Sequence, residues 1–475
     1  MYPGNPATAV EPSRTRSRSN TEPYTAPHTA SWAEGLAALR ARQQRTANTA
    51  LAAVGLVGGV ALGLTFQAIW PLGSTLADLL WAASVLAAVV GTYGVLILLV
   101  LIARLPVLER AIGQDRLVVA HKRIAPWALS LVAAHVVLVV ASYARTAVVS
   151  WWSELWSLNT TTPWILPATA GLAALVLAGL TSWRHARSRM RHETWWTIHL
   201  YTYLGIALAF AHQITAGGPF MTGWARALWV ALYVATFGSI LWFRVLVPLR
   251  RSWRHDLRVA AVVRETPDMV SVLVSGRNLR ALGVQPGQFF NWRFLHPGLR
   301  YEAHPYSLSG LPRQGMMRLT VKALGDASTA LADVPVGTRV LVEGPYGATT
   351  PVRVRGSRVV LVAAGAGIAP IRTLVDTLGA HLPVDVIYRA SNPQDLALAQ
   401  ELRGLARPNR VRVHLMAGSR TTYPLTADHL YSLVGPLSDA DVFVCGPESL
   451  NQLVERSARE LGADPDRIHH EEFNL

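Results

Sequence analysis

Four histidines lie in or beside apolar stretches of this sequence, where ionisable side chains are costly and usually functional. One expected helix, extended back by about a turn from its apolar stretch, carries His121 and His135, and another carries His199 and His212. The members of each pair are 14 and 13 residues apart, which corresponds to ~21 and ~20 Å of helix rise. Because imidazole binds haem iron axially, one histidine from each helix at each of two depths predicts two bis-histidine haems. Packed or proton-relay histidines are the alternative.

The two spacings differ in helical phase. On a regular helix, two side chains 14 residues apart differ in direction by ~40° about the helix axis, so they share a face. Two side chains 13 residues apart differ by ~140°, so they point to different faces. We therefore expect the helix that carries His199 and His212 to be irregular, or the two haems to approach it from different sides.

A second group of motifs, after residue 300, suits a flavin. In His304-Pro-Tyr-Ser-Leu-Ser309 a strand is expected, on which Tyr306 covers the isoalloxazine ring and Ser307 bonds its polar edge. Plain strand packing is the alternative. A strand-to-helix junction follows, where backbone N–H groups and hydroxyls can hold a pyrophosphate. Its candidate residues are Lys322, Gly325, Ser328 and Thr329.

The next motif suits a nicotinamide dinucleotide. Gly365, Gly367 and Pro370 follow a buried strand and open a helix, so the backbone can approach the dinucleotide closely. The second strand of this region is followed by Arg389 and Ser391, which suit the 2′-phosphate of NADPH better than the ribose diol of NADH.

Two candidates lie near the end of the chain. Cys445 and Gly446 close the last expected strand, so the thiol is placed at the carboxyl edge of the sheet, where nicotinamide is expected. A small buried thiol without a role is the alternative. Phe473 is expected to stack on the flavin and to be displaced by nicotinamide; a tail that simply packs down is the alternative.

Six apolar stretches, each near the ~20 residues that cross ~30 Å of hydrocarbon, predict six spanning helices. They cover residues 47–68, 77–103, 124–144, 164–182, 194–215 and 224–247. Arginines concentrate in the 104–123 and 183–193 connections and after the sixth stretch. The positive-inside rule then predicts a multi-pass protein of the plasma (inner) membrane with both termini cytoplasmic. These arginines explain much of the net charge of +15, so no nucleic-acid partner is expected. Gly55, Gly59 and Gly63 predict a close-packing face on the first helix.

The remaining chain divides by composition. Residues 1–30 predict a disordered tail, and residues 31–46, with a Ser31–Glu34 capping box, predict an interfacial helix before a membrane domain at 47–250. Short β-rich segments at 255–350 predict an antiparallel barrel, and alternating strands and helices at 357–475 predict a doubly wound α/β domain. Cys445 is the only cysteine, which excludes an intramolecular disulfide and Cys-ligated zinc or iron–sulfur clusters.

The ordered combination of the two histidine pairs, His-Pro-Tyr-Ser, Gly-Ala-Gly-Ile-Ala-Pro, Cys-Gly-Pro and a near-terminal Phe resembles the NADPH oxidase and ferric reductase superfamily. It looks like a bacterial member without a calcium-binding extension. The resemblance implies that cytoplasmic NADPH or NADH passes electrons through FAD and two b-type haems to an acceptor on the outer side. It places FAD at Tyr306, Ser307 and the 322–329 turn, and the nicotinamide nucleotide at 365–370, Arg389 and Cys445.

The acceptor is expected to be small, because the outer connections at 145–163 and 216–223 contain no His or Cys and are too short to form a substrate domain. Molecular oxygen, giving superoxide, is placed ahead of a ferric chelate. Membrane lipid is the other expected partner, and no obligate protein partner is expected. The rival interpretations are a non-enzymatic haem-binding membrane protein, such as a sensor or haem transporter, and a donor subunit that feeds a partner protein.

Overall fold

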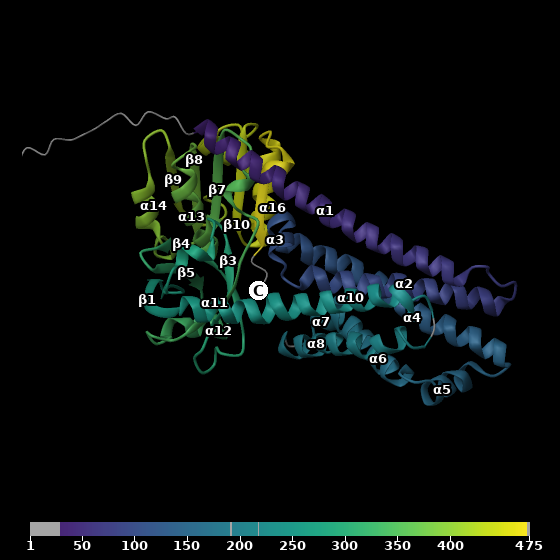
Figure 1. Ribbon diagram of the computed structural model, residues 1–475. Coiled ribbons are helices and arrows are strands. Elements are labelled where there is room, and N and C mark those ends of the chain that lie inside the picture. Colours follow the sequence, from purple (N-terminus) through teal and green to yellow (C-terminus); the bar gives the residue numbers. More distant parts are fainter. Residues whose placement is uncertain (1–28, 191, 217, 473–475) are drawn as a thin grey trace, which may run out of the picture.

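The computed structural model describes residues 29–190, 192–216 and 218–472. A bundle of helices forms one half of the molecule, and two sheets with their helices form the other (Figure 1). Residues 1–28 of the tail expected at 1–30, and the candidate Phe473, lie outside the described residues. Residues 29 and 30 belong to the first helix instead.

The helical half has twelve consecutive helical elements among the described residues. They are α1 (Thr29–Ile69), α2 (Leu76–Ile102), α3 (Pro106–Ile112), α4 (Gln114–Ala147), α5 (Trp151–Thr161), α6 (Ile165–Ser182), α7 (Arg184–Arg187), α8 (His192–Leu208), α9 (Phe210–Gln213), α10 (Gly223–Ile240), the π-helical η1 (Leu241–Leu246) and α11 (Val247–His255). Of the described helices, five are long and apolar enough to cross a membrane. Their ranges are Ser31–Ile69, Leu76–Ile102, Arg116–Ala147, Ile165–Ser182 and Gly223–His255.

The fifth of the six expected spans, 194–215, is interrupted. Here α8 has 17 residues and ends at Leu208, and the four-residue α9 begins at Phe210. The irregularity that the 13-residue histidine spacing predicted is therefore present, between His199 and His212.

The first helix differs from the expectation of a separate interfacial helix at 31–46. One continuous helix of 41 residues, α1, runs through this segment and the first apolar stretch. No proline or glycine interrupts residues 36–54, so nothing in the chain stops helix propagation there. The first turns of α1 lie against the second sheet instead, where Trp32 stacks on His381 with ring centroids 4.7 Å apart.

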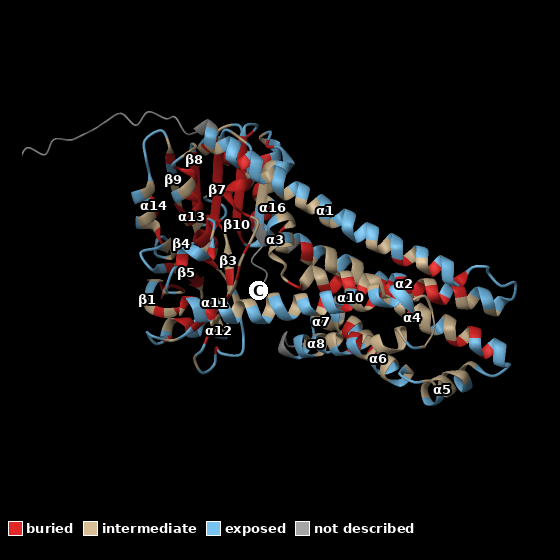
Figure 2. Cartoon of the chain, in the orientation of Figure 1, coloured by how far each residue is buried: buried red, intermediate tan, exposed pale blue. Residues whose placement is uncertain are grey.

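Apolar side chains cover much of the outside of the bundle. Leu56, Trp127 and Leu166 are more than half exposed, and Figure 2 shows buried residues concentrated in the sheets. An exposed apolar surface of this extent is typical of a lipid-facing bundle. The close-packing face expected at Gly55, Gly59 and Gly63 was wrong, since a Cβ there would meet no described atom within 4 Å; these glycines belong to the outer face.

The first sheet is antiparallel, with strand order β1-β2-β5-β4-β3-β6. Its strands are β1 (Arg258–Thr266), β2 (Met269–Ser275), β3 (Phe289–Phe294), β4 (His304–Arg313), β5 (Met316–Lys322) and β6 (Val340–Tyr346), and α12 (Asp326–Ala330) follows β5. The two edge strands meet at one end, where Val259 N donates to Thr338 O at 2.9 Å and Val340 N donates to Leu257 O at 2.9 Å. The sheet thus curves around a core that contains Phe290.

The second sheet is parallel, with strand order β11-β10-β7-β8-β9. Its strands are β7 (Arg358–Ala364), β8 (Val384–Ala390), β9 (Val411–Ala417), β10 (Ala440–Gly446) and β11 (Ile468–Glu472). The helices are α13 (Ile368–Leu378), α14 (Ala399–Leu405), α15 (Ala427–Val434) and α16 (Glu448–Glu460). The 3-10 turns of this half are η2 (Leu279–Leu282), η3 (Leu331–Asp333), η4 (Pro351–Arg353), η5 (Gly365–Gly367), η6 (Pro393–Asp395) and η7 (Pro465–Arg467). Separate buried clusters on the two faces, one under α13 and the other under α15 and α16, give the expected doubly wound arrangement.

Candidate functional site

His121 on α4 and His199 on α8 face each other inside the bundle. Their ring centroids are 6.4 Å apart and their planes are inclined by 66°. Two imidazoles on opposite sides of one metal ion place their centroids ~6 Å apart, since each metal–nitrogen bond is about 2 Å and each nitrogen lies about 1.1 Å from its ring centre. The spacing of this pair fits axial ligation of one iron by both rings.

Carbonyl groups of α2 orient the two histidines of α4. His121 Nδ1 lies 3.2 Å from Leu98 O, and His135 Nδ1 lies 3.2 Å from Ser84 O and 2.9 Å from Ser84 Oγ. A carbonyl oxygen only accepts, so Nδ1 carries the proton in both rings and Nε2 keeps its lone pair for a metal.

The second pair of candidates is His135 on α4 and His212 on α9. Within the described part of the chain, His199 Nδ1 and His212 Nδ1 are buried without a hydrogen-bond partner, which is uncommon unless water or a bound group completes the contact. Among the described residues no group of three or more His, Cys, Asp or Glu side chains could hold a metal ion. Haem needs only two protein ligands, so these four histidines fit it.

A polar contact that the sequence interpretation missed fixes α9. Gln213 Oε1 accepts from Trp229 Nε1 at 2.8 Å, and Gln213 Nε2 lies 2.9 Å from Tyr233 Oη. Both partners lie on α10. Because Gln213 directly follows His212, this contact holds the histidine of the broken helix in place.

Replacing Gln213 by Leu is expected to loosen His212 while leaving His121 and His199 in place. The change leaves the Trp229 and Tyr233 donors unsatisfied, at a cost of about 1 to 3 kcal/mol. Low-temperature electron paramagnetic resonance of the oxidised protein should show one altered and one unchanged low-spin haem signal. Thr215→Val, which removes a hydroxyl bonded only to Ala211 O, is the matched control. Two unchanged signals in Gln213→Leu would contradict this role.

The flavin candidates lie on β4 as expected. Ser307 is 6% exposed, and the Tyr306 backbone is held by Trp292 Nε1, which donates to Tyr306 O at 2.9 Å. Burial raises the pKa of the Tyr306 phenol above its usual value, with Glu302 adding to the effect. The ring therefore stays neutral, as a residue that covers a flavin requires.

The candidate pyrophosphate-binding residues lie at two different sites. Ser328 Oγ accepts from Gly325 N at 3.0 Å and Thr329 Oγ1 donates to Gly325 O at 2.9 Å, so both hydroxyls build the turn itself. Lys322 instead reaches toward Gly365, where a Cβ would lie 3.9 Å from Nζ. Lys322 also forms an ion pair with Asp268 at 3.1 Å.

A cavity of about 290 Å³ opens at the carboxyl end of the parallel strands. It brings together four residues singled out from the sequence, namely Lys322, Gly365, Arg389 and Ser391, and adds Ser419 and Arg420. Burial lowers the pKa of Arg389, and the neighbouring Arg420 lowers it further. The one carboxylate of the lining, Asp395, accepts from Asn392 Nδ2 at 2.9 Å. The cavity is therefore arranged for an anion.

The sequence interpretation missed Ser419 and Arg420, although a signal was present. Both residues directly follow β9, and carboxyl ends of neighbouring parallel strands share one edge of the sheet.

The glycine motif and Cys445 meet at a close contact. A Cβ on Gly367 would lie only 1.8 Å from Cys445 O, and Gly365 has φ +55°. Both positions therefore require glycine. Cys445 lies at the end of β10, as expected, with its side chain fully buried. Gly446 packs against Leu450, and Pro370 is buried in the first turn of α13.

Glu401 of α14 ties the two sheets together. Its carboxylate accepts from Arg318 Nη2 of β5 at 2.8 Å and from Arg372 Nε of α13 at 2.9 Å. The bond from Arg318 holds the pKa of Glu401 below its usual value. This bridge fixes the flavin candidates relative to the nucleotide cavity.

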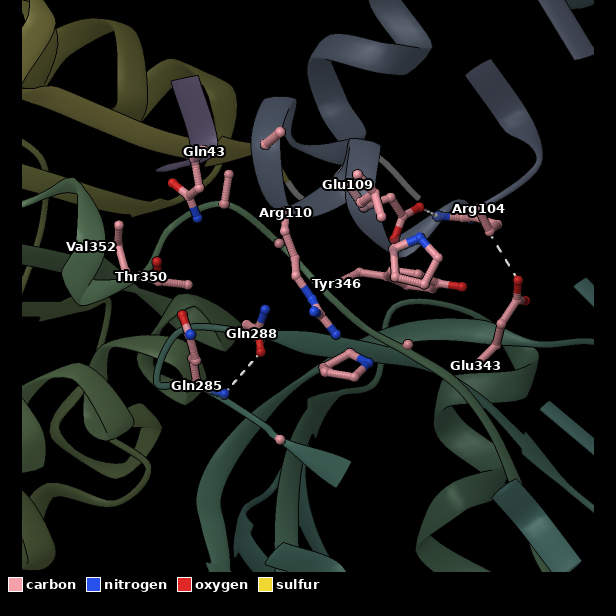
Figure 3. Close-up of a pocket in the computed structure, with 18 of the residues that line it drawn as sticks. Gln43, Arg104, Glu109, Arg110, Gln285, Gln288, Glu343, Tyr346, Thr350 and Val352 are labelled. Atoms are coloured by element: carbon pink, nitrogen blue, oxygen red, sulfur yellow. Dashed lines mark hydrogen bonds and ion pairs between the residues drawn. The ribbon is translucent and has the colours of Figure 1, made fainter. Parts of the chain in front are cut away.

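The bundle is joined to the first sheet through Arg104, which the sequence interpretation did not single out. Arg104 lies 3.5 Å from Glu109 and 3.8 Å from Glu343 of β6, and its guanidinium stands 4.3 Å from the ring centre of Tyr346. Figure 3 shows these side chains converging at the junction.

Arg104→Ala is expected to slow electron transfer between the two halves without affecting the nucleotide cavity. It removes an ion pair and a cation–π contact, together about 1 to 2 kcal/mol. In anaerobic stopped-flow, flavin bleaching by NADPH should keep its rate while haem reduction slows. Arg250→Ala, an exposed arginine of α11, is the control. An unchanged rate of haem reduction in Arg104→Ala would refute the role of this contact.

Three family models match successive parts of the chain. "Ferric reductase like transmembrane component" matches residues 87–210, "FAD-binding domain" matches 254–350, and "Oxidoreductase NAD-binding domain" matches 361–456. The first range contains all three of His121, His135 and His199 but ends just before His212.

Curated relatives match about half of the chain. Flavohemoprotein A of Dictyostelium discoideum is 27% identical over 283 residues, 55% of this chain and 71% of that protein. The ferredoxin reductase component of 3-ketosteroid-9-alpha-monooxygenase from Mycobacterium tuberculosis is 30% identical over 234 residues, 46% of this chain and 65% of that protein. Among solved structures, the flavohem-like FAD/NAD binding domain of nitric oxide dioxygenase from Vibrio cholerae is 24% identical, with a TM-score of 0.39 over 46% of this chain and 98% of that one.

Proposed function

Because the chain belongs to the ferric reductase and NADPH oxidase superfamily, we propose that this oxidoreductase moves electrons from NADPH through FAD and two haems across the membrane. The inner haem is held by His121 and His199 and the outer haem by His135 and His212. The facing rings of His121 and His199, 6.4 Å apart within the bundle, carry the proposal. The FAD-binding part is the antiparallel sheet, which we take to be a barrel, and the NADPH-binding part is the doubly wound domain.

Different residues of the two sheet domains bind different parts of the nucleotide and the flavin. Positive charge for the nucleotide phosphates comes from Arg389, Arg420 and Lys322. The glycines of η5 have no side chain, so the dinucleotide can approach the backbone there closely. Tyr306 and Ser307 orient the flavin, and buried Cys445 lies beneath the nicotinamide position. When bound, FAD accepts the two electrons of a hydride and releases them one at a time to haem, which accepts single electrons.

The residues of the bundle orient the histidine rings. The carbonyl groups of Leu98 and Ser84 bind Nδ1 of His121 and His135, which would leave Nε2 of each ring able to hold iron. Trp195 stacks on His199 with centroids 5.1 Å apart and fixes that ring. Arg104, at the junction, places the inner pair at the end of the bundle nearest the first sheet, and α5 lies at the far end (Figure 1).

We propose that this near end is cytoplasmic, in the plasma membrane, and that the acceptor meets the outer haem at the far end. Short connections there favour a small acceptor, and the apolar Trp152 and Trp156 of α5, 74% and 73% exposed, offer little to a charged chelate. Superoxide formation is therefore placed ahead of ferric-chelate reduction. A donor subunit for a partner protein remains the second candidate, because several relatives carry names of reductase components and electron transfer subunits.

The test uses purified full-length protein in sealed vesicles of known orientation. A pyridine haemochrome assay should give two b-type haems per chain, and anaerobic NADPH should reduce flavin and then both haems. Superoxide-dismutase-sensitive dye reduction should exceed ferric-chelate reduction on the far side. Faster ferric reduction without oxygen would reverse the order of acceptors, and haem that NADPH does not reduce would refute the proposal.

A further inference from the structure

A second, larger cavity lies at the junction of the two halves. It has a volume of about 510 Å³, and Figure 3 shows the side chains that point into it. Its walls come from α1, α3, α11 and the segment from β6 to η4. The residues assigned above to haem, flavin and NADPH do not belong to its lining.

The charge of this cavity is unbalanced. Its five arginines are Arg42, Arg104, Arg110, Arg251 and Arg353, against the two carboxylates Glu109 and Glu343. Both carboxylates lie beside Arg104, and Arg251 donates to Gly344 O. No carboxylate of the described residues forms an ion pair with Arg42, Arg110 or Arg353.

Arg353 is partly buried beside other arginines, so its positive charge is repelled there. Burial lowers the pKa of its guanidinium, and the neighbouring Arg116 and Arg355 lower it further. Gln43 and Thr350 add neutral donors to the same walls. An anion in the cavity would relieve the repulsion, and planar guanidinium groups suit the oxygens of a phosphate.

Apolar side chains also line the cavity. Val107 of α3 is 59% exposed, and Phe243 of η1 and Val247 of α11 belong to the same lining. These side chains lie where the spanning helices end, at the level of lipid headgroups. A ligand with a phosphate and an adjoining hydrocarbon part matches this mixed lining, and basic pockets at this depth suit anionic headgroups.

We propose that this cavity binds the phosphate of an anionic ligand, held by Arg42, Arg110 and Arg353, and that an anionic phospholipid of the adjacent leaflet supplies it. Because the walls come from both halves, the bound phosphate bridges the bundle and the first sheet. A soluble phosphate compound offers the same chemistry, so the test separates the two sources. This ligand is additional to those of the proposed electron path.

The test uses the full-length protein loaded with FAD and haem in phosphatidylcholine nanodiscs, with or without phosphatidylglycerol, and follows thermal unfolding by flavin fluorescence. Phosphatidylglycerol should raise the midpoint of the wild type. The Arg110→Gln/Arg353→Gln double variant should lose this gain, with affinity at least ~10-fold weaker. The Arg250→Gln/Arg254→Gln variant removes the same charge from exposed positions of α11 outside the cavity and should keep the gain.

A second arm adds inorganic phosphate to phosphatidylcholine nanodiscs. A gain there that the cavity variant also loses supports the phosphate site with a soluble source. Equal responses of the wild type and both double variants would overturn the proposal, as would a gain that appears only in FAD-free protein. If the Gln variant does not fold, Arg110→Lys/Arg353→Lys keeps the charge but loses the planar fork, and it should bind more weakly than the wild type; equal binding would again overturn the proposal.

Discussion

Replacing His121 by Leu is expected to remove one haem per chain and to stop reduction of the remaining haem by NADPH. Leu cannot ligate iron, and the outer haem receives its electrons only through the inner one. His199→Leu should give the same result, because the two rings face each other at 6.4 Å. The haem content by pyridine haemochrome and the anaerobic stopped-flow traces at flavin and haem wavelengths together measure the effect.

The outer pair provides the matched comparison. His135→Leu should also lose one haem, but NADPH should still reduce the haem that remains, while the acceptor no longer receives electrons. Flavin reduction should keep its rate in all three variants, since the nucleotide cavity lies in the other half of the molecule. Two haems with unchanged bis-histidine spectra in His121→Leu or His199→Leu would disprove the pairing.

The facing of His121 and His199 could be predicted because the membrane limits what a histidine can do there. An ionisable ring in hydrocarbon needs a partner, and equal depths on two helices suggest which rings meet. The helical phase of His199 and His212 also predicted an irregular helix. Its position at Ala209 and the Gln213 contact that holds it could not be predicted, because the partners Trp229 and Tyr233 lie 16 and 20 residues away in sequence.

The course of the first helix shows the opposite case. The Ser31–Glu34 pattern predicts the start of this helix to within two residues. The change from polar to apolar sequence after residue 46, however, does not end the helix, which continues to Ile69. Polarity changes the surroundings of a helix without stopping it, since only a breaker or a cap ends the hydrogen-bond pattern. The surface that receives this helix includes Val352 O and Val354 O, which accept from Arg40. A partner more than three hundred residues distant leaves no local signal.

The junction between the halves was beyond sequence interpretation for the same reason. Glu343, Gly344 and Tyr346 contact Arg104 and Arg251 of the helical half. The sequence supplies both sets of residues, but their pairing depends on how the bundle docks on the sheet.

Arg389→Ala is expected to raise KM for NADPH by roughly 10- to 150-fold, because a charge-assisted contact to the 2′-phosphate contributes about 1.5 to 3 kcal/mol. Arg420→Ala should have a similar effect, since both guanidinium groups line the same cavity and the positive charge of Arg420 lowers the pKa of Arg389. NADH has no 2′-phosphate, so its KM should change much less in both variants. Arg407→Ala, an exposed arginine of the same domain outside the cavity, is the control for loss of charge, and initial rates of flavin reduction measure all three. Equal changes for NADPH and NADH would show that Arg389 supports the fold of the loop instead of selecting the nucleotide.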